Sequence, residues 1–319
     1  MRGLFCLALL FAGIAPAQQK PVPLIFDTDI GDDIDDALAL ALVLQSPEVD
    51  VRLVTTVADD VESRTRLASK ELGVYGRQDI AVATGAGEPL LDPSYPTHAA
   101  QFKILTAQDQ LPPAAHRNAA TAITETLLAS DRKVTILALG PLTNIALALK
   151  LEPRIKPKIE RIVLMGGAYF RQKSEYNITR DRIAAAIVFS SGISITAVGL
   201  DVTEFFRLES QDVERIHAAH NPGSEFLARL IELWQEGDAG KLPVLYDPVA
   251  AGAALKPSLI QTLSGTVEVE TRAPTFFGVT RFTQTTGDRK GPVQVARGVN
   301  APEFLQLFMD RLTAAPRGR

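Results

Sequence analysis

The chain has 319 residues, with 33 Lys or Arg against 37 Asp or Glu and a net charge of −4. This near balance, without a basic cluster that contains interleaved aromatic residues, argues against nucleic acid as a partner. The length suits one large α/β domain with a substantial core, and no low-complexity or linker segment indicates a second one.

Residues 1–17 predict a secretory signal peptide that is not part of the fold. Met1–Gly3 gives a short positive start, Leu4–Ile14 is apolar but too short to span a bilayer, and Ala15-Pro16-Ala17 has the small-x-small form of a cleavage site. Cleavage after Ala17 would leave a domain of residues 18–319, secreted or periplasmic, without a stable membrane anchor. It would also remove Cys6, the only cysteine, and with it any disulfide or Cys-ligated zinc.

Short apolar runs then alternate with longer helical patterns. The first runs predict strands at 22–26, 51–57, 80–84, 134–139, 162–165 and 195–198, with helices near 35–45, 62–73, 118–130, 142–150 and 182–191. Further helices are expected at 210–236, 248–255 and 302–312, and further strands at 266–270, 276–282 and 293–296. Nearly continuous apolar strands that alternate with helices predict an open, mostly parallel α/β sheet covered by helices on both faces.

The turn after the first predicted strand is strongly acidic. Asp27 to Asp36 contains six carboxylates in ten residues, directly before the first predicted helix. One or two of them could cap the helix or complement its dipole, but six are too many for that role alone. Crowded carboxylates raise each other's pKa or gather around a cation, and hard oxygen ligands without nearby Cys or His indicate Ca²⁺ or Mg²⁺ rather than zinc.

Polar or glycine-rich segments also follow the other predicted strands. A predicted strand is followed by each of these segments: Asp59-Asp60, Gly140-Pro141, Gly166-Gly167 and Asp201. All are therefore expected at the rim where an open α/β sheet binds its ligand. The segment 85–118 has loop composition over much of its length, which fits either a lid over this rim or an ordinary surface loop.

Six strings in chain order resemble the calcium-dependent nucleoside hydrolases. They are Asp27-Thr-Asp-Ile-Gly with Asp35-Asp36-Ala, Ala138-Leu-Gly-Pro-Leu-Thr-Asn144, Met165-Gly-Gly, Glu175-Tyr-Asn177, Val198-Gly-Leu-Asp201-Val-Thr and Tyr246-Asp247-Pro248. The resemblance implies hydrolysis of the N-glycosidic bond of ribonucleosides to base and ribose, with one Ca²⁺ per site, in purine or pyrimidine salvage. It also implies a small-molecule nucleoside or riboside as the partner, and a homodimer or homotetramer.

The resemblance assigns a role to each motif residue. Asp29 would be a metal ligand and the general base for the attacking water, with Asp36, Asp247 and the backbone carbonyl of Leu139 as further ligands. Asp35, Glu175 and Asn177 would hold the ribose hydroxyls, Met165 would lie under the sugar, and Asp27 would order the turn. Read alone, Asp247 before Pro248 is equally a helix N-cap.

Three departures from the family pattern leave questions open. Two extra residues between Gly31 and Asp35 mean that Asp33 could take the role given to Asp35 or Asp36. Asp60 stands where many members carry an amide that would contact the substrate. Tyr246 stands where many members have His; it would contact the substrate, but with an ordinary pKa of about 10 it is a poor proton donor at neutral pH. Activation of the leaving base would then lie elsewhere, or the base leaves easily.

Two other functions are weighed beside the hydrolase. Tyr246 and Asp60 also fit an exported, calcium-dependent protein that binds nucleosides or ribosides without turnover. An Asp-x-Asp after a strand also occurs in haloacid-dehalogenase-like phosphotransfer enzymes, which have no place for the later motifs. Among the histidines, His98 in the 85–118 segment could contact a base, and His217 and His220 are most simply exposed helix residues.

Overall fold

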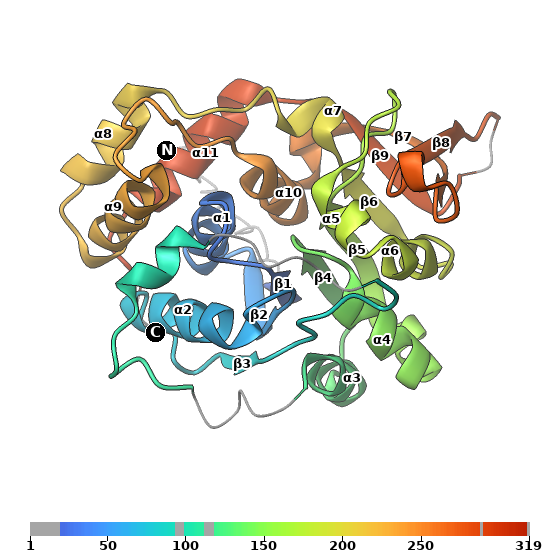
Figure 1. Cartoon of the computed structure of the whole chain (residues 1–319), viewed down its shortest axis with the longest axis horizontal. Coiled ribbons are helices and arrows are strands. Elements are labelled where there is room, and N and C mark those ends of the chain that lie inside the picture. The colour runs from blue at the N-terminus through green and yellow to red at the C-terminus, as the bar shows by residue number, and fades with distance from the viewer. Residues whose placement is uncertain (1–19, 93–98, 112–117, 288–289, 318–319) are drawn as a thin grey trace, which may run out of the picture.

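The computed structural model describes residues 20–92, 99–111, 118–287 and 290–317. The predicted signal segment with Cys6, as well as His98 and His116, lie outside these ranges. Within them, the strands form one nine-stranded sheet with helices on both faces (Figure 1). No helix in the same ranges combines the length and the apolar character needed to cross a bilayer.

The strands and helices begin and end as follows. The strands are β1 Val22–Thr28, β2 Val49–Thr56, β3 Ala81–Ala83, β4 Val134–Ala138, β5 Ile159–Met165, β6 Ile195–Val198, β7 Ile260–Val269, β8 Thr280–Gln284 and β9 Val293–Val299. The α-helices are α1 Asp35–Leu44, α2 Val61–Val74, α3 Ala119–Ala129, α4 Thr143–Leu151, α5 Tyr176–Arg180, α6 Arg182–Phe189, α7 Leu200–Thr203, α8 Ser210–Ala218, α9 Pro222–Gln235, α10 Tyr246–Leu255 and α11 Ala301–Leu312. Short 3-10 helices are η1 Ala100–Ile104, η3 Pro153–Lys158, η4 Pro257–Leu259 and η5 Pro274–Phe276.

The order of the strands determines where a ligand can bind. It runs β3-β2-β1-β4-β5-β6-β9-β7-β8, and every neighbouring pair from β3 to β9 is parallel, whereas β7 is antiparallel to both β9 and β8. The direction of strand addition reverses between β1 and β4. At such a switch point the following loops diverge to opposite faces and leave a crevice at the carboxyl ends of the strands.

Alternation along the central strands builds a core on each face of the sheet. Leu24 and Phe26 of β1 pack with α1, α2, α9, α10 and α11, while Ile25 between them packs with α3, α4 and α6 on the opposite face. All three side chains are fully buried. Figure 1 shows α1 and α10 on one side of the sheet and α3 and α4 on the other. Burial on both faces explains why these strands read as continuous apolar runs.

The predicted fold class and most predicted elements are confirmed, and the differences have local causes. The short helices α5 and α7 were not predicted, and the predicted helical stretch 210–236 is two helices because Asn221 caps a new helix before Pro222. β7 begins at Ile260, before the predicted 266, since pairing with β9 extends it. The strand predicted at 276–282 begins only at Thr280, after η5.

Candidate active site

A cavity of about 600 Å³ lies at the carboxyl ends of the strands. Its walls come from the acidic turn, the ends of β4 and β5, helices α5 and α10, and the segments around α9. The lining residues are Asp29, Asp32, Asp33, Asp35, Asp36, Ala100, Leu139, Met165, Lys173, Ser174, Glu175, Tyr176, Asn177, Leu200, Trp234, Glu236, Lys241, Tyr246 and Asp247. The structure therefore gathers nearly all of the predicted site residues around one space.

Asp27, at the end of β1, ties the acidic turn to the neighbouring strands. Its carboxylate accepts hydrogen bonds from the Thr55 hydroxyl and from Asn144 Nδ2, the latter at 2.8 Å, and its carbonyl accepts from the N–H of Leu139 at 2.8 Å. The pKa of Asp27 is raised to about 6, because the effect of burial exceeds the opposite effect of the hydrogen bonds from Asn144 and Thr55. These contacts fit the predicted role of ordering the turn, since they join Asp27 to neighbouring elements. Asp27 does not itself line the cavity.

Three carboxylates in the cavity form a compact group. One oxygen each from Asp35, Asp36 and Asp247 lies within 4.8 Å of the others, and all three side chains are buried. Asp35 also accepts the backbone N–H of Asp247 at 3.0 Å, and Asp36 accepts from the Thr28 hydroxyl. Asp29 lines the same cavity next to this group, and the charge of Asp36 contributes to raising the pKa of Asp29.

The electrostatics of this group call for a cation. Burial first, and then repulsion among neighbouring carboxylates, raises the pKa of Asp29, Asp35 and Asp247 well above the usual range, and the pKa of Asp36 rises to about 7, chiefly by burial. The charge of Arg64 lowers the pKa of Asp29 and Asp36, but one guanidinium cannot balance four ionised carboxylates. A donor set made only of buried carboxylate oxygens fits a hard divalent cation.

Asp33 lies outside the three-carboxylate group. Its carboxylate accepts the N–H of Ile34 at 2.7 Å, and its carbonyl accepts from Gln101 Nε2 at 2.6 Å. Burial raises the pKa of Asp33 while the charge of Lys241 lowers it. Asp33 thus contacts η1 and lies near the segment after α9, whereas Asp35 and Asp36 are the acids of the turn that lie beside Asp247.

The opposite wall carries amide and carboxylate groups. Glu175 caps α5, with its carboxylate accepting the backbone N–H groups of Gly167, Asn177 and Ile178 at 2.9–3.0 Å. Asn177 Nδ2 donates to the carbonyl of Leu139 at 2.6 Å and to that of Met165 at 3.2 Å. The four predicted residues of this wall all line the cavity: Leu139, Met165, Glu175 and Asn177. The carbonyl of Leu139 already accepts one hydrogen bond, from Asn177.

Tyr246 and Asp60 differ in position. Tyr246 lies at the start of α10 and lines the cavity, and burial, together with the charges of Asp33 and Asp35, raises its pKa. It is therefore an even weaker proton donor than an ordinary tyrosine. Asp60 is exposed and does not line the cavity; its carboxylate accepts the N–H of Ser63 at 3.0 Å and caps α2. The prediction that Asp60 contacts the substrate does not fit this position.

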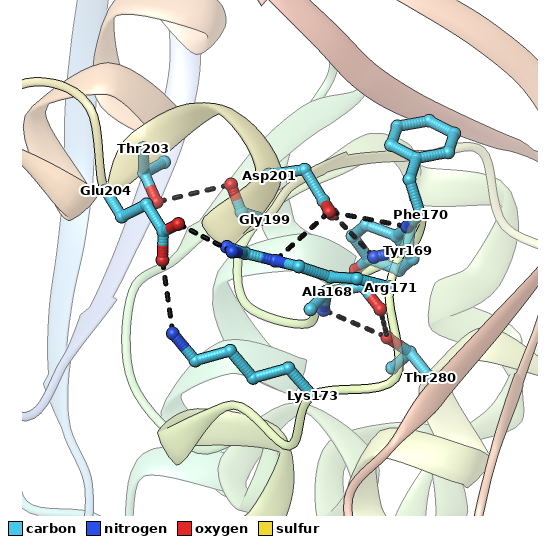
Figure 2. Close-up of polar contacts among 10 residues, drawn as sticks. All are labelled: Ala168, Tyr169, Phe170, Arg171, Lys173, Gly199, Asp201, Thr203, Glu204 and Thr280. Atoms are coloured by element: carbon cyan, nitrogen blue, oxygen red, sulfur yellow. Dashed lines mark hydrogen bonds and ion pairs between the residues drawn. The ribbon is translucent and has the colours of Figure 1, made fainter.

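The loop after β5 contacts α7 and Glu204, the residue that follows α7. Figure 2 shows Asp201 and Glu204 facing this loop. Asp201 accepts the backbone N–H of Tyr169 at 2.5 Å and lies 3.6 Å from Arg171 Nε. Glu204 pairs with Arg171 at 2.6 Å and with Lys173 at 3.1 Å. Because Lys173 lines the cavity, Asp201 and Glu204 fix part of its wall from outside.

Several cavity residues were not found from the sequence. Tyr176 lies inside a motif that was quoted only for its neighbours, whereas Trp234 and Lys241 come from segments without a motif. Lys241 Nζ lies 3.9 Å from the ring centroid of Trp234. An aromatic residue near a helix end, seven residues before a lysine, carries no distinctive local signal. Only the packing of α9 beside the acidic turn reveals these residues.

Fold and site together define an open α/β enzyme with a carboxylate cluster for a metal ion in its active-site cavity. The family model described as inosine-uridine preferring nucleoside hydrolase matches residues 24–306. The chain belongs to this family, and its reaction is the hydrolysis of ribonucleosides at the N-glycosidic bond.

Individual relatives cover nearly the whole chain. The pyrimidine-specific ribonucleoside hydrolases RihA of Citrobacter koseri and of Escherichia coli O127:H6 are 35% and 36% identical over 310 residues, covering 91% of this chain and 98% of each relative. The solved purine-preferring ribonucleoside hydrolase from Gardnerella vaginalis is 30% identical, with a TM-score of 0.81 and coverage of 91% and 98%. The inosine-uridine preferring nucleoside hydrolase from Bacillus anthracis is 27% identical, with a TM-score of 0.75 and coverage of 92% and 99%.

Proposed function

We propose that this protein is a Ca²⁺-dependent ribonucleoside hydrolase whose metal ligands are Asp29, Asp36, Asp247 and the carbonyl of Leu139. The observation that carries the proposal is the buried carboxylate group of Asp35, Asp36 and Asp247 beside Asp29. Carboxylates together with a backbone carbonyl favour Ca²⁺, since Mg²⁺ prefers a smaller site and keeps more of its water. A bound divalent cation would supply Lewis-acid stabilisation to the attacking water and to vicinal sugar hydroxyls.

The residues of the chain divide the remaining work between two walls. Asp29 accepts the proton of the attacking water, while Asp35, Glu175 and Asn177 hold the ribose hydroxyls. Glu175 is suited to this task because backbone N–H groups fix its carboxylate and leave it capacity for a further hydrogen bond. Met165 provides an apolar contact beneath the sugar. Groups held this way favour the oxocarbenium-like transition state by position as well as by charge.

The departing base is activated without a histidine next to the last ligand. Tyr246 occupies that position, and its raised pKa leaves it a hydrogen-bond donor rather than an acid. Two relatives are named pyrimidine-specific, so we propose uridine and cytidine as the first substrates to test. Inosine is the natural comparison, because a solved relative is named purine-preferring.

A riboside panel tests the reaction and the ion together. Purified residues 18–319 are assayed for ribose release from purine, pyrimidine and pyridine ribosides, with added Ca²⁺ and with excess chelator. We expect Ca²⁺-dependent release, and a loss of about 1000-fold or more in kcat for Asp29→Ala at unchanged melting temperature. Turnover that persists in chelator would contradict the metal mechanism. Nucleoside binding by calorimetry without any product would instead support the non-catalytic binder.

Two further proposals follow from the sequence. We expect export with cleavage after Ala17, which mass spectrometry of the protein from an export-competent host measures directly. A product that still begins at residue 1 would contradict it. For the assembly we expect a homodimer or homotetramer, which light scattering on the purified protein measures.

A further inference from the structure

The turn after β2 holds two consecutive non-glycine residues in the left-handed region. Ala58 has φ 68° and Asp59 has φ 54°. This conformation is unfavourable for an L-residue, and the methyl side chain of Ala58 cannot compensate by a local hydrogen bond. Strain of this kind persists only where surrounding contacts impose it, and it gathers at functional sites.

Arg64 joins this strained turn to the acidic turn. Its side chain is 1% exposed, and its Nε donates to the carbonyl of Ala58 at 2.8 Å. Its Nη1 donates to the carbonyl of Ile30 at 2.9 Å and also to the carbonyl of Asp29. A guanidinium buried this deeply is stable only when its donors are satisfied. Arg64 thus fixes the backbone of the proposed base, Asp29.

Asp59 links Arg64 to the other wall of the cavity. Its carboxylate is 7% exposed and lies 3.8 Å from Arg64 Nη2, while its other oxygen pairs with Arg180 Nη2. Arg180 is the last residue of α5, and its guanidinium lies 5.6 Å from the ring centroid of Tyr176 on the same helix. One carboxylate therefore stands between the guanidinium under the acidic turn and the guanidinium at the end of α5.

We propose that Asp59 is a positioning residue that couples the metal-side wall of the cavity, through Arg64, to the sugar-side wall on α5, through Arg180. The inference rests on the proposed function, because it concerns the alignment of Asp29 with Tyr176 and Asn177. Low exposure strengthens these ion pairs, since water and salt screen them little. The strained φ at Asp59 is the conformation that places its carboxylate between the two arginines.

A double-mutant cycle tests the coupling. Asp59→Asn keeps a residue that tolerates left-handed φ but removes the charge, and Arg180→Met removes the partner on α5. We expect each single variant to raise KM for uridine about 10-fold with kcat changed less than about 3-fold, and the double variant to raise KM no further. Calcium affinity by calorimetry should stay near that of the wild type, because both variants leave Arg64 in place with its hydrogen bonds to the carbonyls of Asp29 and Ile30.

The control variant is Glu152→Gln, which breaks the ion pair between Glu152 and Arg154 at the end of α4. Its KM and kcat should equal those of the wild type. Should Asp59→Asn prove unstable, Asp59→Gly removes the same carboxylate while accepting φ 54°, and it should show the same rise in KM.

Two results would overturn the inference: KM changes that multiply in the double variant, or a KM for Asp59→Asn within about 2-fold of the wild type. A wild-type protein without Ca²⁺-dependent turnover would instead refute the proposed function. The two failures are therefore distinguishable in one set of measurements.

Discussion

Asp35 and Asp247 meet in the carboxylate group although 212 positions separate them in the chain. Asp35 begins α1 and Asp247 lies in the first turn of α10, so both acids face the positive end of a helix dipole. That dipole offsets only part of the repulsion, worth roughly 0.3–1 kcal/mol for each acid near a helix terminus. A bound cation would offset the rest of this repulsion. The change in cation affinity when one acid is substituted therefore measures the role of that acid.

Substituting Asp247 and Asp33 separately should distinguish a ligand from a neighbour. Asp247→Asn should weaken Ca²⁺ binding about 100-fold or more, since even residues that only support a ligand cost 10- to 100-fold. Asp33→Asn should weaken it less than about 3-fold, because Asp33 lies outside the three-carboxylate group. Calorimetric titration with Ca²⁺ measures both. Equal losses in the two variants would show that the extra residues of the turn do contribute a ligand.

The same residues show how far sequence reasoning reaches. The acidic turn and Asp247 were predictable as a cation site because carboxylate density and the ordered motifs are local signals. The choice among Asp33, Asp35 and Asp36 was not, since it depends on contacts of the extra residues with Gln101 and Lys241, far along the chain. For Arg64, the sequence contains one weak indication of burial, because it lies on the same helical face as the apolar residues Leu67 and Ala68.

At the scale of elements, the short helix α7 helps to hold the loop after β5 in place. It follows β6 directly and presents Asp201 to the loop after β5, whose backbone N–H groups and Arg171 meet that carboxylate. Glu204, one residue past α7, pairs with Arg171 and Lys173 from a more exposed position. Two acids therefore hold one loop, but with different degrees of burial.

Removing each acid should have a different effect on stability. Asp201→Asn should lower the free energy of unfolding by about 1–3 kcal/mol, because its carboxylate is 8% exposed and accepts backbone N–H groups that would lose a partner. Glu204→Gln should cost less than about 1 kcal/mol, as is usual for solvent-accessible ion pairs. Denaturant unfolding monitored by circular dichroism measures both. A larger loss for Glu204→Gln would contradict the assignment of Asp201 as the main anchor.

Element prediction succeeded where the pattern was local. The six strands from β1 to β6 follow from apolar runs, since burial on both faces requires them. Helices α5 and α7 are too short to show a periodic pattern in the sequence. The side chain of Glu175 caps α5, and the carbonyl of Gly199 accepts the first hydrogen bonds of α7. β7 contains Gly265 and alternating polar residues, so its full length depends on its partner β9.

At the scale of the whole molecule, the fold brings acids from distant parts of the chain together. The chain itself does not supply enough positive charge to balance all of them. Helices α1 and α10 pack against each other on one face of the sheet, and their first turns meet where Asp35 accepts the backbone N–H of Asp247. The fold thus confines Asp35, Asp36 and Asp247 in a buried space. The pH dependence of its stability should therefore differ with and without a bound cation.

Without a cation, folding should be favoured by protons. The pKa of Asp27 rises to about 6 and that of Asp36 to about 7 in the folded protein, both from an ordinary value of 3.8. The folded state then holds more protons than the unfolded chain between about pH 4 and pH 7, so stability falls as pH rises through this window. In excess chelator the melting temperature should be about 5 °C or more higher at pH 5.5 than at pH 7.5.

Calcium should remove or reverse that trend, because a bound cation keeps the carboxylates ionised and competes with protons for them. The stabilisation by millimolar Ca²⁺ should consequently be larger at pH 7.5 than at pH 5.5, as differential scanning fluorimetry can measure at both pH values. Magnesium at the same concentration serves as the matched control and should stabilise less, since the proposed carbonyl ligand and large oxygen set suit Ca²⁺. A chelated protein that is more stable at pH 7.5 than at pH 5.5 would show that these buried acids are already compensated within the chain, and the cation would then have no structural role.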